Sequence, residues 1–129
     1  MTAQLNHTIV WCSDKQRSSA FLAEMLGLPD PVPFAHFLVI PLENGVSMDF
    51  MEKEGPIALQ HYAFLVSDAE FDAGMAKIAE KRLTYWADPA RQGVNQINRH
   101  WGGRGVYFED PDGHFLELIT KPYGSESEL

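Results

Sequence analysis

The sequence predicts an α+β protein made of two similar halves, each running strand, helix and then further strands. Residues 5–14 align without a gap with residues 59–68, so that a Leu, a His, a Ser and an Asp coincide, and residues 45–49 align with residues 113–117. Residues 5–14 and 59–68 are each followed by apolar residues at helical spacing. Residues 45–49 and 113–117 have the composition of strands. We therefore expect one domain with an internal repeat.

Composition limits the class of protein. The 129 residues are 45% hydrophobic and 22% charged, with 10 Lys+Arg against 18 Asp+Glu and a formal net charge of −8. A chain of this size buries a core and an internal ligand site without disulfides, and its single cysteine, Cys12, excludes a disulfide within the chain. The acidic balance argues against nucleic-acid partners and anionic membrane surfaces, because both kinds of binding need Lys and Arg on the protein.

No segment of the sequence has the pattern of an export signal or of a membrane span. Residues 1–10 lack a basic stretch followed by an apolar one, and no apolar run approaches the ~18 residues that cross a bilayer. We expect a cytoplasmic protein that forms a single domain over residues 1–129. Its modules are expected at about 4–54 and 56–122, with a flexible tail at 123–129.

Two helices are expected, over residues 14–26 and 68–83, because apolar residues recur there on one helical face. A serine precedes each helix, Ser13 or Ser67, with a Gln or a Glu three residues later, which is the spacing of a capping box. Gly27 is placed to end the first helix in the left-handed conformation that glycine tolerates. These signals predict that the first strand of each half runs directly into a helix.

Further strands are expected at residues 34–42 and 46–51 in the first half and at 106–109 and 115–120 in the second. The offset between the halves is 54 residues at their first strands and 68 at their last, so the second half has 14 additional residues. Most of them fall in residues 87–103, which are polar and lack clear periodicity. A loop of this length in a small domain is usually functional or mobile.

The first and last strands of the two halves carry the candidate chemistry. His7 and His61 occupy the same position in the repeat, and Asp49 and Glu117 point away from the side of their strands that packs against the helices. If a pseudo-twofold axis relates the halves, two imidazoles and two carboxylates converge on one concave surface. Two His and a carboxylate with open positions suit one divalent ion such as Fe, Mn, Zn, Ni or Co, although a single strand His is more often a hydrogen-bonded structural residue.

Residues 105–118, with the sequence GVYFEDPDGHFLEL, resemble the C-terminal signature of the vicinal oxygen chelate (VOC) superfamily, also called the glyoxalase/bleomycin resistance/dioxygenase proteins. With the two strand-His-helix openings, the resemblance covers almost the whole chain. It implies two βαβββ modules that form a cupped mixed β-sheet, with a divalent metal ion inside the cup. It also implies that His7, His61 and Glu117 are the metal ligands.

Asp49 stands where glyoxalase I-type members of this superfamily have a Glu. Its side chain is one methylene shorter, which leaves three roles open: a contact with the metal through a water, a catalytic general base, or a solvated strand carboxylate.

The long loop and its borders supply candidate substrate-binding residues. Arg104 has the fork geometry to clamp an anionic substrate oxygen, or it pairs with one of the many acids of the chain. His100 and Trp101 precede two glycines, so they are candidates for a lid that closes over the pocket, or for ordinary loop packing.

The resemblance implies a metal-dependent enzyme that chelates vicinal oxygens of a small substrate. The open chemistries are lyase or isomerase, thiol transfer to an antibiotic epoxide, and dioxygenation. Asp49 in place of Glu weighs against lyase or isomerase chemistry, and the lack of a basic cluster weighs against thiol transfer. The short chain weighs against dioxygenation, since ring-cleaving members usually have four modules. The alternative is metal-free drug sequestration of the bleomycin-resistance kind. Members of the superfamily commonly form homodimers, some with sites shared between chains.

Overall fold

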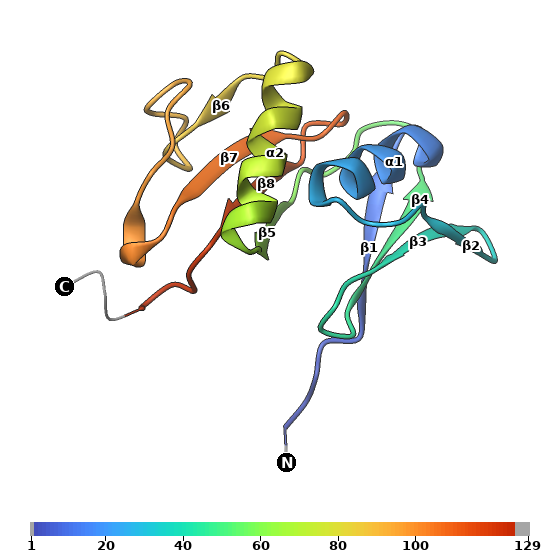
Figure 1. Ribbon diagram of the computed structural model, residues 1–129. Coiled ribbons are helices and arrows are strands. Elements are labelled where there is room, and N and C mark those ends of the chain that lie inside the picture. Colours follow the sequence, from blue (N-terminus) through green and yellow to red (C-terminus); the bar gives the residue numbers. More distant parts are fainter. Residues whose placement is uncertain (1, 126–129) are drawn as a thin grey trace.

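The computed structural model describes residues 2–125 of the chain, and Figure 1 shows their arrangement. Two modules follow each other, and each contains one helix and one four-stranded mixed sheet. The first module contains β1 (His7–Cys12), α1 (Lys15–Leu26), β2 (Val32–Phe34), β3 (Phe37–Pro41) and β4 (Ser47–Glu52). The second contains β5 (His61–Leu65), α2 (Asp68–Glu80), β6 (Tyr85–Trp86), the 3-10 turn η1 (His100–Gly102), β7 (Gly105–Glu109) and β8 (Phe115–Ile119).

The two sheets have the same topology. Their strand orders are β1-β4-β3-β2 and β5-β8-β7-β6, and in each the first strand pairs in parallel with the last while the other pairs are antiparallel. This confirms the predicted α+β fold of two βαβββ modules. Because β1 and β5 each stand at the end of a sheet, each has one edge that no strand of the described residues covers.

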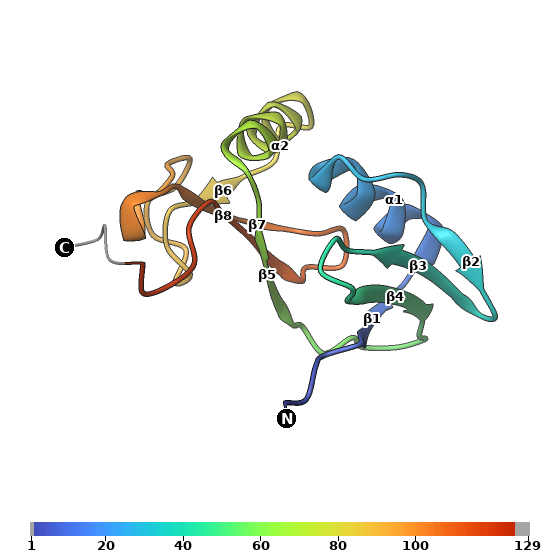
Figure 2. The ribbon, with the colours of Figure 1, turned by 60° about the horizontal axis from the view of Figure 1, so that its bottom comes forward.

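Both helices lie on the same side of the sheets and next to each other, as Figure 2 shows. They cover a core that includes Phe50, Phe71, Ile78, Phe108 and Leu118. Strand residues therefore alternate between this core and the opposite, uncovered face. On β1, for example, Val10 and Cys12 are buried whereas His7, Ile9 and Trp11 are exposed. The candidate chemistry lies on the uncovered face.

The helix boundaries confirm one capping box and correct the other. At α2 the Ser67 side chain accepts from the Glu70 backbone N–H while the Glu70 side chain accepts from the Ser67 N–H, as predicted. At α1 the N-cap is Asp14, not Ser13. Ser13 instead donates its N–H and its hydroxyl to Asp112 of the second module, and its oxygen accepts from the Arg17 guanidinium. Helix α2 also ends at Glu80, three residues earlier than expected.

The single strand expected over residues 34–42 is a hairpin of β2 and β3. The chain turns at Ala35 and His36, where Ala35 adopts φ +52°, and Phe34 pairs with Phe37 across the turn. Ala-His is not a sequence that signals a tight turn, so the pattern of apolar residues predicted one continuous strand. His36 is consequently an exposed turn residue. Among the described residues no helix combines the length and apolarity needed to cross a bilayer.

Candidate metal site and its surroundings

His61 and Glu117 form the centre of the candidate site. The His61 Nε2 atom lies 3.0 Å from Glu117 Oε1, and His61 Nδ1 lies 2.9 Å from the carbonyl oxygen of Phe115. A carbonyl only accepts, so Nδ1 carries a proton and donates it there. This fixes the orientation of the ring and turns Nε2 toward the carboxylate, the arrangement in which a second partner orients a metal-binding His.

The other oxygen of Glu117 is held by two tyrosines that the sequence did not single out. The Tyr123 hydroxyl donates to Glu117 Oε2 at 2.6 Å, and the Tyr107 hydroxyl lies 3.2 Å from that of Tyr123. Since Tyr123 uses its proton on Glu117, Tyr107 is the donor in the second bond. Burial, together with the hydrogen bond to Glu117, raises the pKa of Tyr123, and burial also raises the pKa of Tyr107. Both hydroxyls are therefore protonated donors at neutral pH.

Aromatic side chains form a wall beside this pair. The His61 ring stacks on Tyr107 with centroids 5.9 Å apart, and Tyr107 stacks on Phe115 at 5.3 Å. Trp86 follows at 5.8 Å from Phe115, and the Arg91 guanidinium lies 4.2 Å from the Phe115 centroid. Tyr107 therefore covers one face of the His61 ring, although the His61 side chain is still 46% exposed.

His7 and Asp49 occupy the corresponding face of the first module. His7 pairs in register with Ser47 on β4, and its Nδ1 lies 2.7 Å from Asn6 Oδ1. Asp49 is buried and accepts a hydrogen bond of 2.7 Å from the Ser47 hydroxyl. His7 and Asp49 thus repeat the placement of His61 and Glu117. The shorter Asp49 side chain, however, is hydrogen-bonded to Ser47 of its own strand.

Within one chain, His7 is separated from the other two predicted ligands. His114, next to Phe115 at the start of β8, donates to the carbonyl of Trp11 at the far end of β1. His61 pairs in register with Phe115 and therefore lies near Trp11. His7 stands four residues before Trp11 on β1, which is roughly 13 Å along a strand. Accordingly, no group of three His, Cys, Asp or Glu side chains in residues 2–125 is close enough to hold a metal ion.

The predicted loop residues gather around Glu117, but not all point to it. His100, Trp101 and Arg104 line a small cavity of about 50 Å³ together with Glu117 and Tyr123. Trp101 contacts Tyr123, with ring centroids 6.1 Å apart. These positions place the end of the long loop beside the predicted ligand.

The Arg104 guanidinium is turned toward helix α2. It donates to Asp72 at 2.7 Å and to Asp68 at 3.0 Å, and it lies 4.5 Å from the Phe71 ring centroid. The ion pairs with the two aspartates occupy both of its terminal nitrogens. This is the pairing with acids that stood as the alternative to a substrate clamp.

The tail expected at residues 123–129 is described only up to Ser125. Within that part, Tyr123 is fixed by Glu117 and Trp101 and belongs to the site, while residues 126–129 lie outside the described residues. Tyr107 was in principle detectable, because it stands opposite Glu117 in the β7–β8 hairpin. Tyr123 carried no sequence signal, since its contact depends on how the chain turns after β8.

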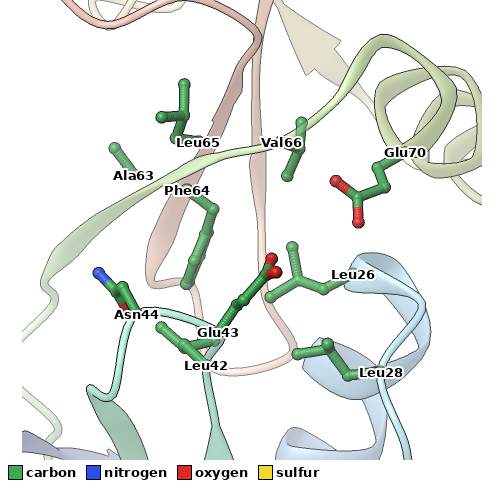
Figure 3. Close-up of a pocket in the computed structure, with 10 residues that line it drawn as sticks. All are labelled: Leu26, Leu28, Leu42, Glu43, Asn44, Ala63, Phe64, Leu65, Val66 and Glu70. Carbon is green, nitrogen blue, oxygen red and sulfur yellow. The ribbon is translucent and has the colours of Figure 1, made fainter.

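A larger cavity lies between the modules, and neither His61 nor Glu117 lines it. It has a volume of about 410 Å³ and is shown in Figure 3. Its walls are the uncovered edge of β5, the end of α1 and the turn between β3 and β4, with mostly apolar side chains. The cavity therefore lies along a sheet edge that a further strand would cover. It is distinct from the small cavity beside Glu117.

The donor chemistry of the candidate site fits a divalent ion. An imidazole nitrogen oriented through its other nitrogen and a carboxylate oxygen in a buried setting are the ligands that Fe, Mn, Zn, Ni and Co accept. One chain supplies these two donors together, and a third donor would complete the smallest set typical of a catalytic site.

Comparisons with known proteins agree with this architecture. The family model described as Glyoxalase/Bleomycin resistance protein/Dioxygenase superfamily matches residues 4–118. A solved structure named oxidase ChaP-H1 is 52% identical, with a TM-score of 0.93 over 95% of this chain and 99% of that one. Glutathione transferase FosA of Serratia marcescens is 30% identical, over 92% of this chain and 81% of its own length. Metallothiol transferase FosB of Lysinibacillus sphaericus is 29% identical over 93% and 84%. These relatives are enzymes, which confirms the expectation of an enzyme.

Proposed function

Because the chain belongs to the Glyoxalase/Bleomycin resistance protein/Dioxygenase superfamily, we propose that it binds one divalent metal ion through His7, His61 and Glu117 and converts a small molecule bound there. The observation that carries the proposal is the His61–Glu117 pair, in which Nε2 and Oε1 face each other at 3.0 Å. Bound at these ligands, the ion supplies a positive centre that accepts two neighbouring substrate oxygens and stabilises negative charge on them.

The side chains around the pair have separable tasks. The Phe115 carbonyl orients the His61 ring so that Nε2 faces Glu117, and the aromatic wall of Trp86, Phe115 and Tyr107 offers a flat apolar surface to the substrate. Trp101 and His100 border the same region from the long loop. Arg104 has no place in this proposal, because its guanidinium is bound to Asp68 and Asp72.

We favour oxidation for this site, with molecular oxygen as the oxidant, which is the dioxygenase option of the superfamily. The relative named as an oxidase is 52% identical and matches this chain over 99% of its own length, whereas the two transferases are 30% and 29% identical. A short chain of two modules is therefore compatible with oxidation. Thiol transfer to an anionic antibiotic would need a cluster of cationic side chains at the site. Arg91 and Arg104 are each paired with carboxylates, which among residues 2–125 leaves Lys121 as the one other Lys or Arg that lines the small cavity beside Glu117.

The position of His7 favours a homodimer in which each site combines two chains. His7 lies far from His61 in its own chain, and β1 and β5 both have uncovered edges. Exposed apolar side chains, including Ile9, Trp11 and Leu65, lie on the same face as the candidate ligands. A second copy placed by a twofold axis would cover these edges and bring His7 of one chain to His61 and Glu117 of the other, twice per dimer.

In such a dimer Asp49 would enter the site with His7. It shares the uncovered face of the first module, and its buried carboxylate, held by Ser47, is a suitable base for a substrate proton. Asp49→Asn would then lower turnover while leaving metal content near that of the unchanged protein.

Mixing two inactive variants tests the proposal. His7→Ala and His61→Ala/Glu117→Gln are each expected to lose bound metal, whereas His36→Ala, in an exposed turn, keeps it. After unfolding and refolding together, about half of the dimers contain one chain of each kind, and each of these has one intact site, so about a quarter of the sites return.

The outcomes separate the parts of the proposal. Metal in the unchanged protein but none in the mixture contradicts the shared site. Absence of stoichiometric metal from the unchanged protein, with a drug-like ligand still bound, overturns the enzyme site in favour of sequestration.

A further inference from the structure

Glu117 has two carboxylate oxygens, and the structure gives each a different partner. Oε1 faces His61 Nε2 at 3.0 Å, and Oε2 accepts the 2.6 Å hydrogen bond from Tyr123. The Glu117 side chain is almost entirely buried, so these contacts determine its orientation. A carboxylate with both oxygens unconstrained can rotate or bind an ion through both atoms. Here only Oε1 is turned toward the imidazole.

The Tyr123 hydroxyl is itself held in place from two sides. Tyr107 donates to it from β7 at 3.2 Å, and the Trp101 ring contacts the Tyr123 ring at a centroid distance of 6.1 Å. Trp101 has a left-handed backbone conformation, φ +62°, which a bulky residue adopts only when its surroundings enforce it. The long loop and the segment after β8 therefore meet at the Tyr123 side chain, whose hydroxyl contacts Glu117.

The exposure of Tyr123 shows that its ring does not build the core. The residue is 61% exposed, although its hydroxyl reaches a buried carboxylate. A tyrosine kept for packing would bury its ring and leave the polar end near water. In Tyr123, by contrast, the hydroxyl contacts the buried Glu117 while the ring stays mostly exposed.

From this arrangement we infer that Tyr123 is a positioning residue for Glu117. Its hydroxyl occupies Oε2 and leaves Oε1 as the oxygen that would hold an ion together with His61, while Tyr107 and Trp101 hold the Tyr123 side chain. This inference rests on the proposed metal site, and it adds a residue that lies outside the predicted set of ligands and substrate contacts. Partners of this kind in other metal sites typically change metal affinity by about 10- to 100-fold when removed.

Binding of Co²⁺ by Tyr123→Phe tests the inference. The variant keeps the exposed ring and removes only the hydroxyl. We expect Co²⁺ affinity, measured by competition with a chromophoric chelator, to fall about tenfold. The visible Co²⁺ spectrum should change as well, because Glu117 is no longer restricted to one oxygen. Tyr85→Phe, which removes a hydroxyl from β6 of the same sheet, should retain the affinity and spectrum of the unchanged protein.

Tyr107 provides a second variant. Because it acts through Tyr123, Tyr107→Phe alone should weaken Co²⁺ binding less than Tyr123→Phe, and adding it to Tyr123→Phe should have little further effect. The midpoint of thermal unfolding of the metal-free Tyr123→Phe protein should fall by only several degrees, because one hydrogen bond to Glu117 is lost but no buried apolar group is.

The results distinguish the inference from the proposed function. If the unchanged protein binds Co²⁺ and His61→Ala does not, the metal site stands, and an unaltered affinity and spectrum in Tyr123→Phe then overturn the role of Tyr123. If the unchanged protein binds no Co²⁺, the proposed function itself is overturned. A large fall in the unfolding midpoint of metal-free Tyr123→Phe would assign Tyr123 a structural role instead.

Discussion

His114 joins the two modules through the carbonyl of Trp11. Its Nε2 atom donates to that oxygen at 2.8 Å, and its Nδ1 atom accepts from the Gln60 backbone N–H at 3.0 Å. The side chain is almost completely buried at the turn between β7 and β8. Because both ring nitrogens are hydrogen-bonded, His114 is a structural residue, and the end of β1 is held against the start of β5.

Replacing His114 should therefore destabilise the protein strongly. His114→Ala removes both hydrogen bonds and leaves a buried gap, so we expect the free energy of unfolding to fall by about 2–4 kcal/mol. Urea unfolding followed by fluorescence measures this loss. His36→Ala, in the exposed turn between β2 and β3, should change the free energy by less than about 0.5 kcal/mol. Equal effects of the two substitutions would contradict the role of His114.

Asp112 should make the stability of the protein depend on pH. Burial by itself raises the pKa of Asp112, but the hydrogen bonds donated by Ser13 and Ser18 outweigh burial and hold the pKa below its ordinary value. The unfolded chain then takes up the proton first, near pH 3.9. The stabilising contribution is therefore complete above about pH 5 and is lost as the pH falls through the folded pKa.

The pH dependence can be assigned with two variants. Between about pH 5 and pH 3, Asp112→Asn and Ser18→Ala should both lose less free energy of unfolding than the unchanged protein does. At pH 7 each should be less stable by about 1 kcal/mol, because a hydrogen bond between the modules is missing. Urea unfolding at a series of pH values measures both quantities, and identical pH profiles in all three proteins would exclude Asp112 as the source.

Arg104 should contribute to stability and not to the site. Its partners Asp68 and Asp72 are mostly exposed, so the ion pairs are screened, and the contact with the Phe71 ring adds a modest term. We expect Arg104→Ala to lower the free energy of unfolding by about 1 kcal/mol, and by less in high salt. Metal content should stay unchanged. If Arg104→Ala instead lost substrate or metal affinity while remaining as stable as the unchanged protein, Arg104 would be assigned to the site.

Metal binding should raise the unfolding temperature. At a free metal concentration about 100 times the dissociation constant, a ligand specific for the folded state adds about 2.7 kcal/mol. Differential scanning calorimetry with Zn²⁺ or Co²⁺ should therefore show an upward shift for the unchanged protein and for His36→Ala, reversed by a chelator. His61→Ala and Glu117→Gln should show no shift, and a shift in His61→Ala as large as that of the unchanged protein would place the ion elsewhere.

Much of the fold was predictable because the repeat is visible in local patterns. The capping box at Ser67, the left-handed glycine at Gly27 and the alternation of β1 depend on neighbours within a few residues. The errors arose at two places. Asp14 and not Ser13 caps α1, and Ser13 is bound to the distant Asp112, while the local turn at Ala35 has no glycine or asparagine to signal it.

The amino-acid sequence by itself determined the two modules, their family and the face on which His7, His61, Asp49 and Glu117 lie, because alternation along a strand assigns every second residue to one side. Only the tertiary structure decided which of these side chains meet. It joins Glu117 to His61 and Tyr123, turns Arg104 to the aspartates of α2, and keeps His7 away from His61 in the same chain. These contacts depend on how the modules pack and where the chain turns after β8, which no local pattern encodes.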